Sequence, residues 1–157
     1  MLIQFQEYLT LSNIYLWATL GVLPFWLILI IIPNSNITKF LLNSILLPLI
    51  ISVVYIYVIY QAFLLGENFF EIFNLYLGLE NLTGIFSTET FLLIFWLHFL
   101  ILNILLGTWV SRDSLKYSMP KLFVILALLM VYFVGPIGLV FYWFFRIFYA
   151  KRISLYD

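Results

Sequence analysis

Four long apolar stretches alternate with short polar segments along this chain. They run over about 12–32, 40–65, 90–111 and 120–146. A helix needs about 20 apolar residues to cross the hydrocarbon core of a bilayer, so each stretch is long enough. Turn-forming residues follow the first stretch, at Pro33 to Asn36, and Gly66 follows the second. The pattern predicts an all-α polytopic membrane protein with four transmembrane helices in one domain, residues 1–157.

The segment between the second and third stretches has a different pattern. Within Gly66–Leu82, the polar or small residues Glu67, Glu71, Asn74 and Gly78 recur every three or four positions, and most of the other residues are apolar. Such a repeat marks one side of a helix. It predicts an interfacial helix between spans 2 and 3. An apolar loop packed on its own helices is an equally good interpretation.

Proline and glycine interrupt three of the predicted spans. Pro24 lies in the first, Pro48 in the second and Gly135-Pro136 in the fourth. Proline removes a backbone hydrogen bond from a helix interior, so a kink is expected at each of the three. Kinked helices leave gaps that suit a long apolar ligand, although they also occur in membrane proteins without ligands.

Composition narrows the function classes. The chain is 66% hydrophobic and 9% charged, with a mean hydropathy of +1.15, whereas soluble domains have about 25% charged residues. No cluster of basic residues predicts nucleic-acid binding. The absence of cysteine excludes disulfides and thiolate chemistry, and a single histidine argues against a multi-histidine metal centre.

Loop charges predict the orientation. The loops after spans 1 and 3 together contain four basic residues. In the loop after span 2, every charged residue is acidic. By the positive-inside rule, loops 1 and 3 face the cytoplasm or stroma, and both termini face the other side. The tail conflicts with this prediction, because it would place Arg146, Lys151 and Arg152 on the wrong side. No basic residue precedes Lys39, which is unlike a secretory or transit peptide and predicts a bacterial or organelle-encoded protein.

The third span contains the residues that are most costly in hydrocarbon. His98 shares one helix face with Leu105, Trp109 and Arg112, while Asn103 lies 140° away at about 100° per residue. Intramembrane polar residues usually face the bundle interior or a functional site. His98 is therefore a candidate for a hydrogen bond to Tyr or Ser of span 2, for general acid–base chemistry, or for ligation of a pigment magnesium. For Asn103, a structural interhelical hydrogen bond is favoured.

Arg112 and Asp113 end the third span at the membrane interface. The simpler interpretation is a positive-inside anchor followed by a solvated acid. The alternative is a polar end-site that grips a hydroxyl or epoxide on a membrane-spanning lipid.

Three sequence blocks together are similar to a known family. They are LPFWLILIIIP (23–33), WLHFLILNILLGTWVSRDS (96–114) and GPIGLVFYWFFR (135–146). In order and spacing they resemble the abscisic-acid-deficient four-like family, whose plant member is a chloroplast membrane protein linked to neoxanthin synthesis. His98, Gly107, Trp109 and Asp113 fit the family's third span. Asn103 stands where the family has an acid, and an amide cannot serve as a carboxylate base.

The resemblance implies a cofactor-independent carotenoid isomerase. In that chemistry the 5,6-epoxide of violaxanthin opens as the polyene loses a proton, and an allene forms. The implied catalytic residues are His98 as proton carrier and Asp113. Arg112 and Asp113 would hold a ring of the substrate, with Asn103 also in the binding site. Trp26, Trp96 and Trp109 would line the polyene.

Two alternatives to an enzyme stay open. One is a non-catalytic pigment-binding or assembly subunit of a photosynthetic complex, which Asn103 favours. The other is a small transporter or channel component, for which a lone histidine is a poor proton relay. The expected partners are membrane lipids, a carotenoid as substrate or bound pigment, and, as one candidate, a photosynthetic membrane complex. The expected location is a thylakoid or plasma membrane of a cyanobacterium or plastid.

Overall fold

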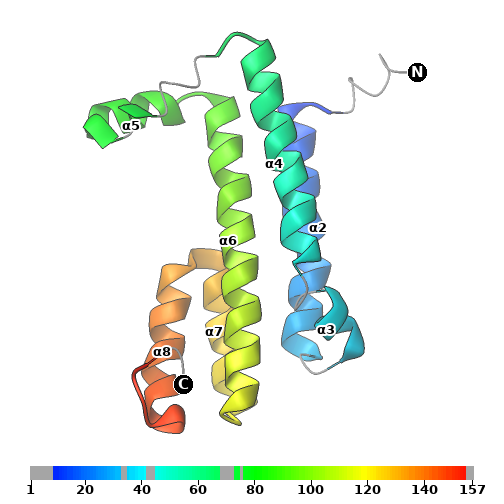
Figure 1. Ribbon diagram of the computed structural model, residues 1–157, viewed down its shortest axis with the longest axis vertical. Coiled ribbons are helices and arrows are strands. Elements are labelled where there is room, and N and C mark those ends of the chain that lie inside the picture. Colours follow the sequence, from blue (N-terminus) through cyan, green and yellow to red (C-terminus); the bar gives the residue numbers. More distant parts are fainter. Residues whose placement is uncertain (1–8, 33–34, 42–44, 68–72, 75, 155–157) are drawn as a thin grey trace. The chain divides into compact units, whose positions relative to one another are not determined.

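The computed structural model describes residues 9–32, 35–41, 45–67, 73–74 and 76–154, and most of these residues lie in helices (Figure 1). The helices are α2 (Leu11–Ile31), α3 (Asn36–Leu41), α4 (Leu46–Leu64), α5 (Leu79–Phe86), α6 (Glu89–Lys116), α7 (Lys121–Val134) and α8 (Pro136–Ala150). Helices α2, α4 and α6 are long and apolar enough to cross a membrane. The all-α prediction is therefore confirmed, and three long apolar helices lie within the first three predicted spans or overlap them.

Local capping explains where the first two helices begin and end. The Thr10 hydroxyl accepts the Asn13 backbone N–H at 3.3 Å and caps α2, which ends just before Pro33. Ser35 caps α3 by accepting the Thr38 backbone N–H at 3.0 Å. The buried Thr38 hydroxyl also donates to the Ile32 carbonyl at 2.7 Å. This bond ties α3 to the end of α2.

The second predicted span is shorter than expected, and the predicted kink at Pro48 is wrong. The helix begins at Leu46, so Pro48 lies in its first turn. Backbone N–H groups in a first turn have no intrahelical partner, and proline is tolerated there without loss of a hydrogen bond. By contrast, α2 continues through Pro24.

The predicted interfacial helix is described only in part. Residues 68–72 and 75, which include Glu71, lie outside the described residues. Single turns of 3₁₀ helix cover 73–74 and 76–77, and the eight-residue α5 follows. None of the α5 side chains is buried. Whether this segment lies in the interface stays a prediction.

The fourth predicted span is not one helix. It consists of two shorter helices, α7 and α8, which pack side by side as a hairpin (Figure 1). Gly135 adopts a φ of +60°, which side chains disfavour, and Pro136 opens α8 at its first turn. The expected kink is therefore a full reversal of chain direction.

Gly138 allows the two helices of this hairpin to pack closely. A Cβ atom there would overlap the backbone nitrogen of Val131 and contact its side chain. Both residues are buried. Because the approach involves backbone atoms, a larger residue cannot be accommodated by turning a side chain.

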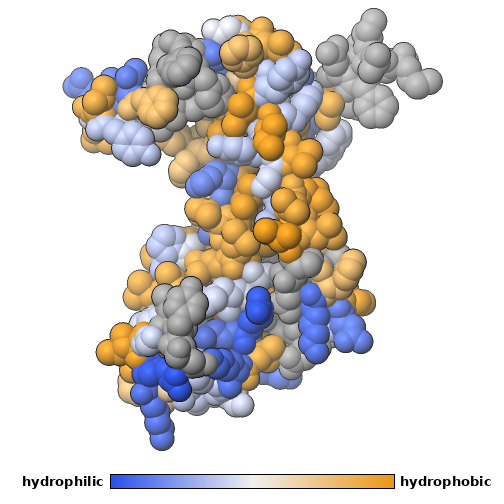
Figure 2. Space-filling view, viewed as in Figure 1, coloured by the Kyte–Doolittle hydropathy of each residue, from blue (hydrophilic) through white to orange (hydrophobic). Residues whose placement is uncertain are grey.

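The chain divides into two compact units. Unit 1 comprises residues 1–21 and 49–101, and unit 2 comprises residues 22–48 and 102–157. All seven basic residues belong to unit 2, and all five glutamates belong to unit 1. In unit 2, hydrophilic residues gather near the ends of α6 and α8 (Figure 2). The single-domain organisation stays a prediction.

Candidate functional site

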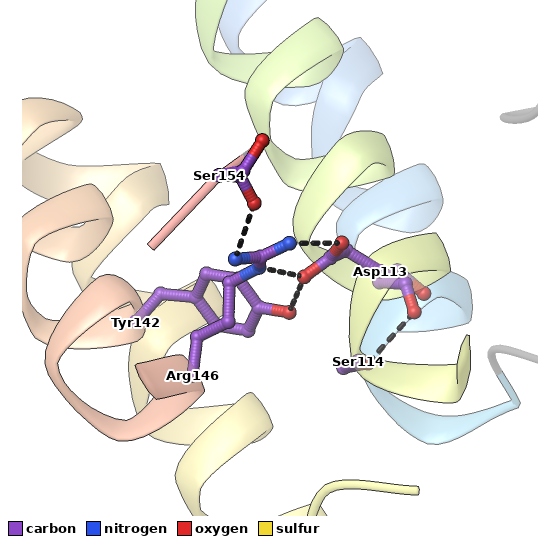
Figure 3. Close-up of polar contacts among 6 residues, drawn as sticks. Asp113, Ser114, Tyr142, Arg146 and Ser154 are labelled. Carbon is purple, nitrogen blue, oxygen red and sulfur yellow. Dashed lines mark hydrogen bonds and ion pairs between the residues drawn. The ribbon is translucent and has the colours of Figure 1, made fainter. Parts of the chain in front are cut away.

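A buried ion pair joins α6 to α8 in unit 2. The Arg146 Nε donates to Asp113 Oδ2 at 2.6 Å, and its Nη2 donates to Oδ1 at 3.3 Å (Figure 3). Arg146 is fully buried and Asp113 is 9% exposed. Two hydrogen bonds from one guanidinium to one carboxylate form a bidentate pair, which fixes the relative orientation of the two side chains.

Two further groups complete this polar cluster, which we define as Asp113, Tyr142, Arg146 and the Ser154 carbonyl. The buried Tyr142 hydroxyl donates to Asp113 Oδ2 at 2.6 Å. The Arg146 Nη1 donates to the Ser154 carbonyl at 3.2 Å (Figure 3). A buried charge is costly unless it is paired and hydrogen-bonded. Here the carboxylate has three hydrogen bonds and the guanidinium has three.

Aromatic rings enclose the polar cluster. The Arg146 guanidinium carbon lies 4.8 Å from the ring centroid of Trp143 and 5.0 Å from that of Tyr117. Trp143 stacks on Trp109 of α6, with 6.2 Å between centroids and 17° between planes. The rings of Trp109 and Tyr142 pack edge-to-face, with 5.5 Å between their centroids. The cluster therefore orients a pair of parallel tryptophan rings.

These two tryptophans form a wall of an open groove in unit 2. The groove has a volume of about 670 Å³. Its lining residues, all apolar or aromatic, are Leu106, Trp109, Leu139, Val140, Trp143, Phe144 and Ile147. Ligand pockets usually occupy about 300–1,000 Å³ and are mainly apolar with a few polar groups. The groove could hold part of a long apolar molecule.

The structure places His98 on an exposed face of α6 in unit 1, fifteen residues before Asp113 in sequence. Its ring lies 6.5 Å from that of Tyr55 on α4. Among the described residues, the expected hydrogen bond from His98 to Tyr or Ser of span 2 is not found. On the predicted face that contains His98, both Leu105 and Arg112 are exposed like His98 and Trp109 is half-buried, whereas Asn103 and Gly107 are buried.

The predicted binding residues occupy different environments. Arg112 is exposed, and the arginine that pairs with Asp113 is Arg146. The interpretation of Asp113 as a solvated acid is therefore wrong. Asn103 is 5% exposed, and its amide nitrogen has no hydrogen-bond partner within the described part of the chain. The structural hydrogen bond that was favoured for this amide is not found there.

Of the three predicted tryptophans, only Trp109 lines the groove. Trp26 is 4% exposed and packs against Gly107 and the ring of Tyr132 within unit 2. In unit 1, the Trp96 indole N–H donates to the Thr19 hydroxyl at 2.8 Å. Both rings therefore have helix-packing roles in the structure, and their ligand contacts stay a prediction.

Sequence reasoning missed Tyr142, Trp143 and Arg146 as site residues. One signal was present, because Arg146 lay on the wrong side of the membrane in the predicted orientation. A misplaced arginine within an aromatic helix indicates a buried partner or an error in topology. The first explanation holds here, since α8 returns along α7 and brings Arg146 to Asp113.

Comparisons with known proteins point to one family. Residues 13–142 match the family model described as ABA DEFICIENT 4-like. The chain is 30% identical over 108 residues to "Protein ABA DEFICIENT 4, chloroplastic" of Arabidopsis thaliana. That alignment covers 67% of this chain and 49% of the relative, so the chain spans about half the length of the curated relative. No solved structure matches the present chain.

Proposed function

Because the chain belongs to the ABA DEFICIENT 4-like family, we propose that it binds a xanthophyll in a plastid-type or cyanobacterial photosynthetic membrane. The groove of unit 2 is the proposed binding site. Its apolar and aromatic lining suits a polyene, and the parallel rings of Trp109 and Trp143 offer flat faces for packing. This aromatic groove, held in place by a buried ion pair, is the observation that carries the proposal.

In this proposal the polar cluster positions the groove wall and does not touch the polyene. Asp113, Tyr142 and Arg146 are at most 9% exposed, and none of them lines the groove. Arg146 contacts the face of Trp143, and Tyr142 contacts Trp109. For Asp113 to accept a hydrogen bond directly from a hydroxyl of a substrate ring, the cluster would have to rearrange. A catalytic role for Asp113 stays a prediction.

An enzyme of this kind would isomerise an epoxide to an allene. A proton leaves the polyene carbon beside the ring, and its bonding electrons form the second double bond of the allene. The C–O bond of the epoxide at the neighbouring ring carbon breaks, and the oxygen takes up a proton. The molecular formula is unchanged, so no oxidant or reductant is consumed. His98 is the candidate proton carrier, and its exposed position on α6 makes it accessible to a ligand in the membrane.

Binding can be tested with a blocked groove. Val140 lines the groove and is 70% exposed, whereas Ile137 on the same helix is 58% exposed and does not line it. The protein would be purified in mild detergent and titrated with violaxanthin, and bound pigment measured by absorption after gel filtration. Val140→Trp should lower the affinity for violaxanthin about tenfold or more, because a loss of roughly 1.4 kcal/mol of binding free energy corresponds to a factor of ten. Ile137→Trp should bind as the wild type does. Equal binding by both variants would contradict the groove assignment.

Catalysis can be tested by chromatography of the same mixtures. Formation of neoxanthin by the wild type and its loss in His98→Ala, with violaxanthin still bound, would support a proton-carrier role. Full conversion by His98→Ala would exclude that role. Bound violaxanthin without any product in the wild type would favour the second candidate, a non-catalytic pigment-binding or assembly subunit. The amide at Asn103, where the family has an acid, favours that candidate.

The hairpin also supports a revised orientation for the protein. We propose that the basic end of unit 2 faces the cytoplasm or stroma and that the C-terminal tail lies on this same side. If α7 and α8 enter and leave the membrane on one side, Arg146, Lys151 and Arg152 join the basic residues of loops 1 and 3. The conflict in the predicted orientation then disappears.

A further inference from the structure

Unit 1 contains a second pocket, separate from the groove of unit 2. It has a volume of about 240 Å³ and lies between the beginning of α2, including Thr10 and Ile14, and α4, including Tyr57 and Gln61. A single water requires about 10–15 Å³ of such volume. Drug-sized ligands occupy pockets of about 300–1,000 Å³. The pocket is therefore sized for one end of a larger molecule.

Two polar side chains of α4 face this pocket, which we call the Gln61 pocket. The Gln61 amide nitrogen donates to the Tyr57 hydroxyl oxygen at 2.9 Å, one helical turn away. With the amide in this orientation, its carbonyl oxygen is the side that stays available as an acceptor. Both side chains are half-buried, so the Tyr57 hydroxyl and the Gln61 amide stay accessible for a further hydrogen bond to a ligand. The pair therefore retains one donor and one acceptor.

An amide in the last turn of α4, a helix that is long and apolar enough to cross a membrane, requires an explanation. Gln61 lies in α4, which contains no charged residue and is otherwise mainly aliphatic or aromatic. Polar groups in hydrocarbon are costly and usually pair with other protein groups, or mark a binding site or a pathway. The bond to Tyr57 uses only one of the two amide hydrogens and leaves the carbonyl oxygen for another donor.

The complementary ligand group is a hydroxyl, because a hydroxyl both donates and accepts. A free acid would place a charge in a pocket that contains no basic residue, and a hydrocarbon would leave both polar groups unpaired. The apolar walls, formed by residues such as Ile14, Val58 and Leu65, suit the carbon skeleton that bears the hydroxyl. The chemistry is that of a hydroxylated ring.

We infer that the Gln61 pocket binds a ring hydroxyl of a membrane-dissolved ligand, with Tyr57 as donor and the Gln61 carbonyl as acceptor. The inference rests on the proposed function only for the identity of the ligand as a xanthophyll. A hydroxylated ring could also come from the sugar headgroup of a galactolipid, and the experiment distinguishes these two sources.

The test compares three ligands on the purified full chain. They are zeaxanthin, which has a hydroxyl on each ring, β-carotene, which has the same polyene without hydroxyls, and monogalactosyldiacylglycerol. The variants are Gln61→Leu and Tyr57→Phe. Tyr60→Phe is the matched control, because Tyr60 lies on the same helix, is 56% exposed and does not line the pocket. Bound ligand is quantified by chromatography after gel filtration, and circular dichroism checks that each variant is folded.

Gln61→Leu should weaken zeaxanthin binding about three- to tenfold, as expected for one or two hydrogen bonds, and leave β-carotene binding unchanged. Tyr57→Phe should also weaken zeaxanthin binding, and Tyr60→Phe should leave it unchanged. If the two pocket variants weaken the binding of the galactolipid alone, the pocket is assigned to a lipid headgroup. If neither pocket variant changes the binding of any hydroxylated ligand, the inference is overturned. By contrast, failure of the wild type to bind any carotenoid would reject the proposed function.

Discussion

Arg146 of α8 and Asp113 of α6 form a bidentate ion pair with a shortest N–O distance of 2.6 Å. They are 33 residues apart in sequence. The pair exists because the chain reverses at Gly135, so that the end of α8 returns to the end of α6 within unit 2. The pair thereby links the ends of α6 and α8, and its Arg146 side chain contacts Trp143 in the groove wall.

Removing one partner of this pair should strongly destabilise the protein. Asp113→Asn leaves the fully buried Arg146 without a counter-charge, which typically costs roughly 3–5 kcal/mol. The free energy of unfolding in detergent, measured with a denaturant series, should fall by that amount. The control is Arg112→Gln, because Arg112 is the exposed neighbour and surface substitutions usually change stability by less than about 0.5 kcal/mol. Equal losses in both variants would contradict a structural role for the buried pair.

The hairpin should not tolerate a side chain at position 138. In Gly138→Ala the new Cβ overlaps the Val131 backbone, so α7 and α8 must separate. We expect a loss of about 1–3 kcal/mol, typical of overpacking. Gly21→Ala is the matched control, since a Cβ there meets nothing within 4 Å and alanine favours a helix. Thermal unfolding would show a lower Tm for the first variant and an unchanged or higher Tm for the second.

Gly107 and Trp26 should be energetically coupled. A Cβ at position 107 would lie 2.5 Å from Cη2 of Trp26, which is the far end of that side chain. Gly107→Ala should therefore destabilise unit 2, and Trp26→Phe should relieve the overlap. A double-mutant cycle should give a coupling energy of about 0.5–3 kcal/mol. Strict additivity of the two substitutions would show that Trp26 moves aside without cost.

The amide of Asn103 should contribute little to stability. Its nitrogen is buried without a partner among the described residues, and such a group incurs a desolvation cost of about 1–3 kcal/mol. Asn103→Leu should leave the free energy of unfolding unchanged or raise it. A marked loss of stability would indicate that the amide has a hydrogen-bond partner in the membrane-embedded protein. Loss of pigment binding at full stability would place that partner on the ligand.

The orientation can be checked with single cysteines, because the natural chain has none. Lys121→Cys, Lys151→Cys and Glu80→Cys introduce thiols at exposed positions. In sealed vesicles, an impermeant maleimide should label positions 121 and 151 from the same side and position 80 from the other. Labelling of position 151 together with position 80 would mean that residues 120–146 cross the membrane as a single span.

The apolar pattern was sufficient to predict the helical class and three long helices. The hydrocarbon core sets a minimum length for a spanning helix, and 9% charged residues leave few other solutions for a chain of this hydropathy. Composition also excluded cysteine and multi-histidine chemistry. Helical periodicity placed His98 and Asn103 on different faces, because α6 is regular over its length.

The local pattern could not decide what happens at Gly135 and Pro136. A Gly-Pro pair can begin either a kink or a reversal, and only packing distinguishes them. The close approach of Gly138 to Val131 and the pairing of Arg146 with Asp113 both favour reversal, and both join residues that are distant in sequence or lie on different helices. The groove wall of Trp109 and Trp143 follows from that reversal. The sequence therefore determined which segments are helical, and the tertiary structure decided which polar residues meet, because a buried charge adopts the arrangement that pairs it.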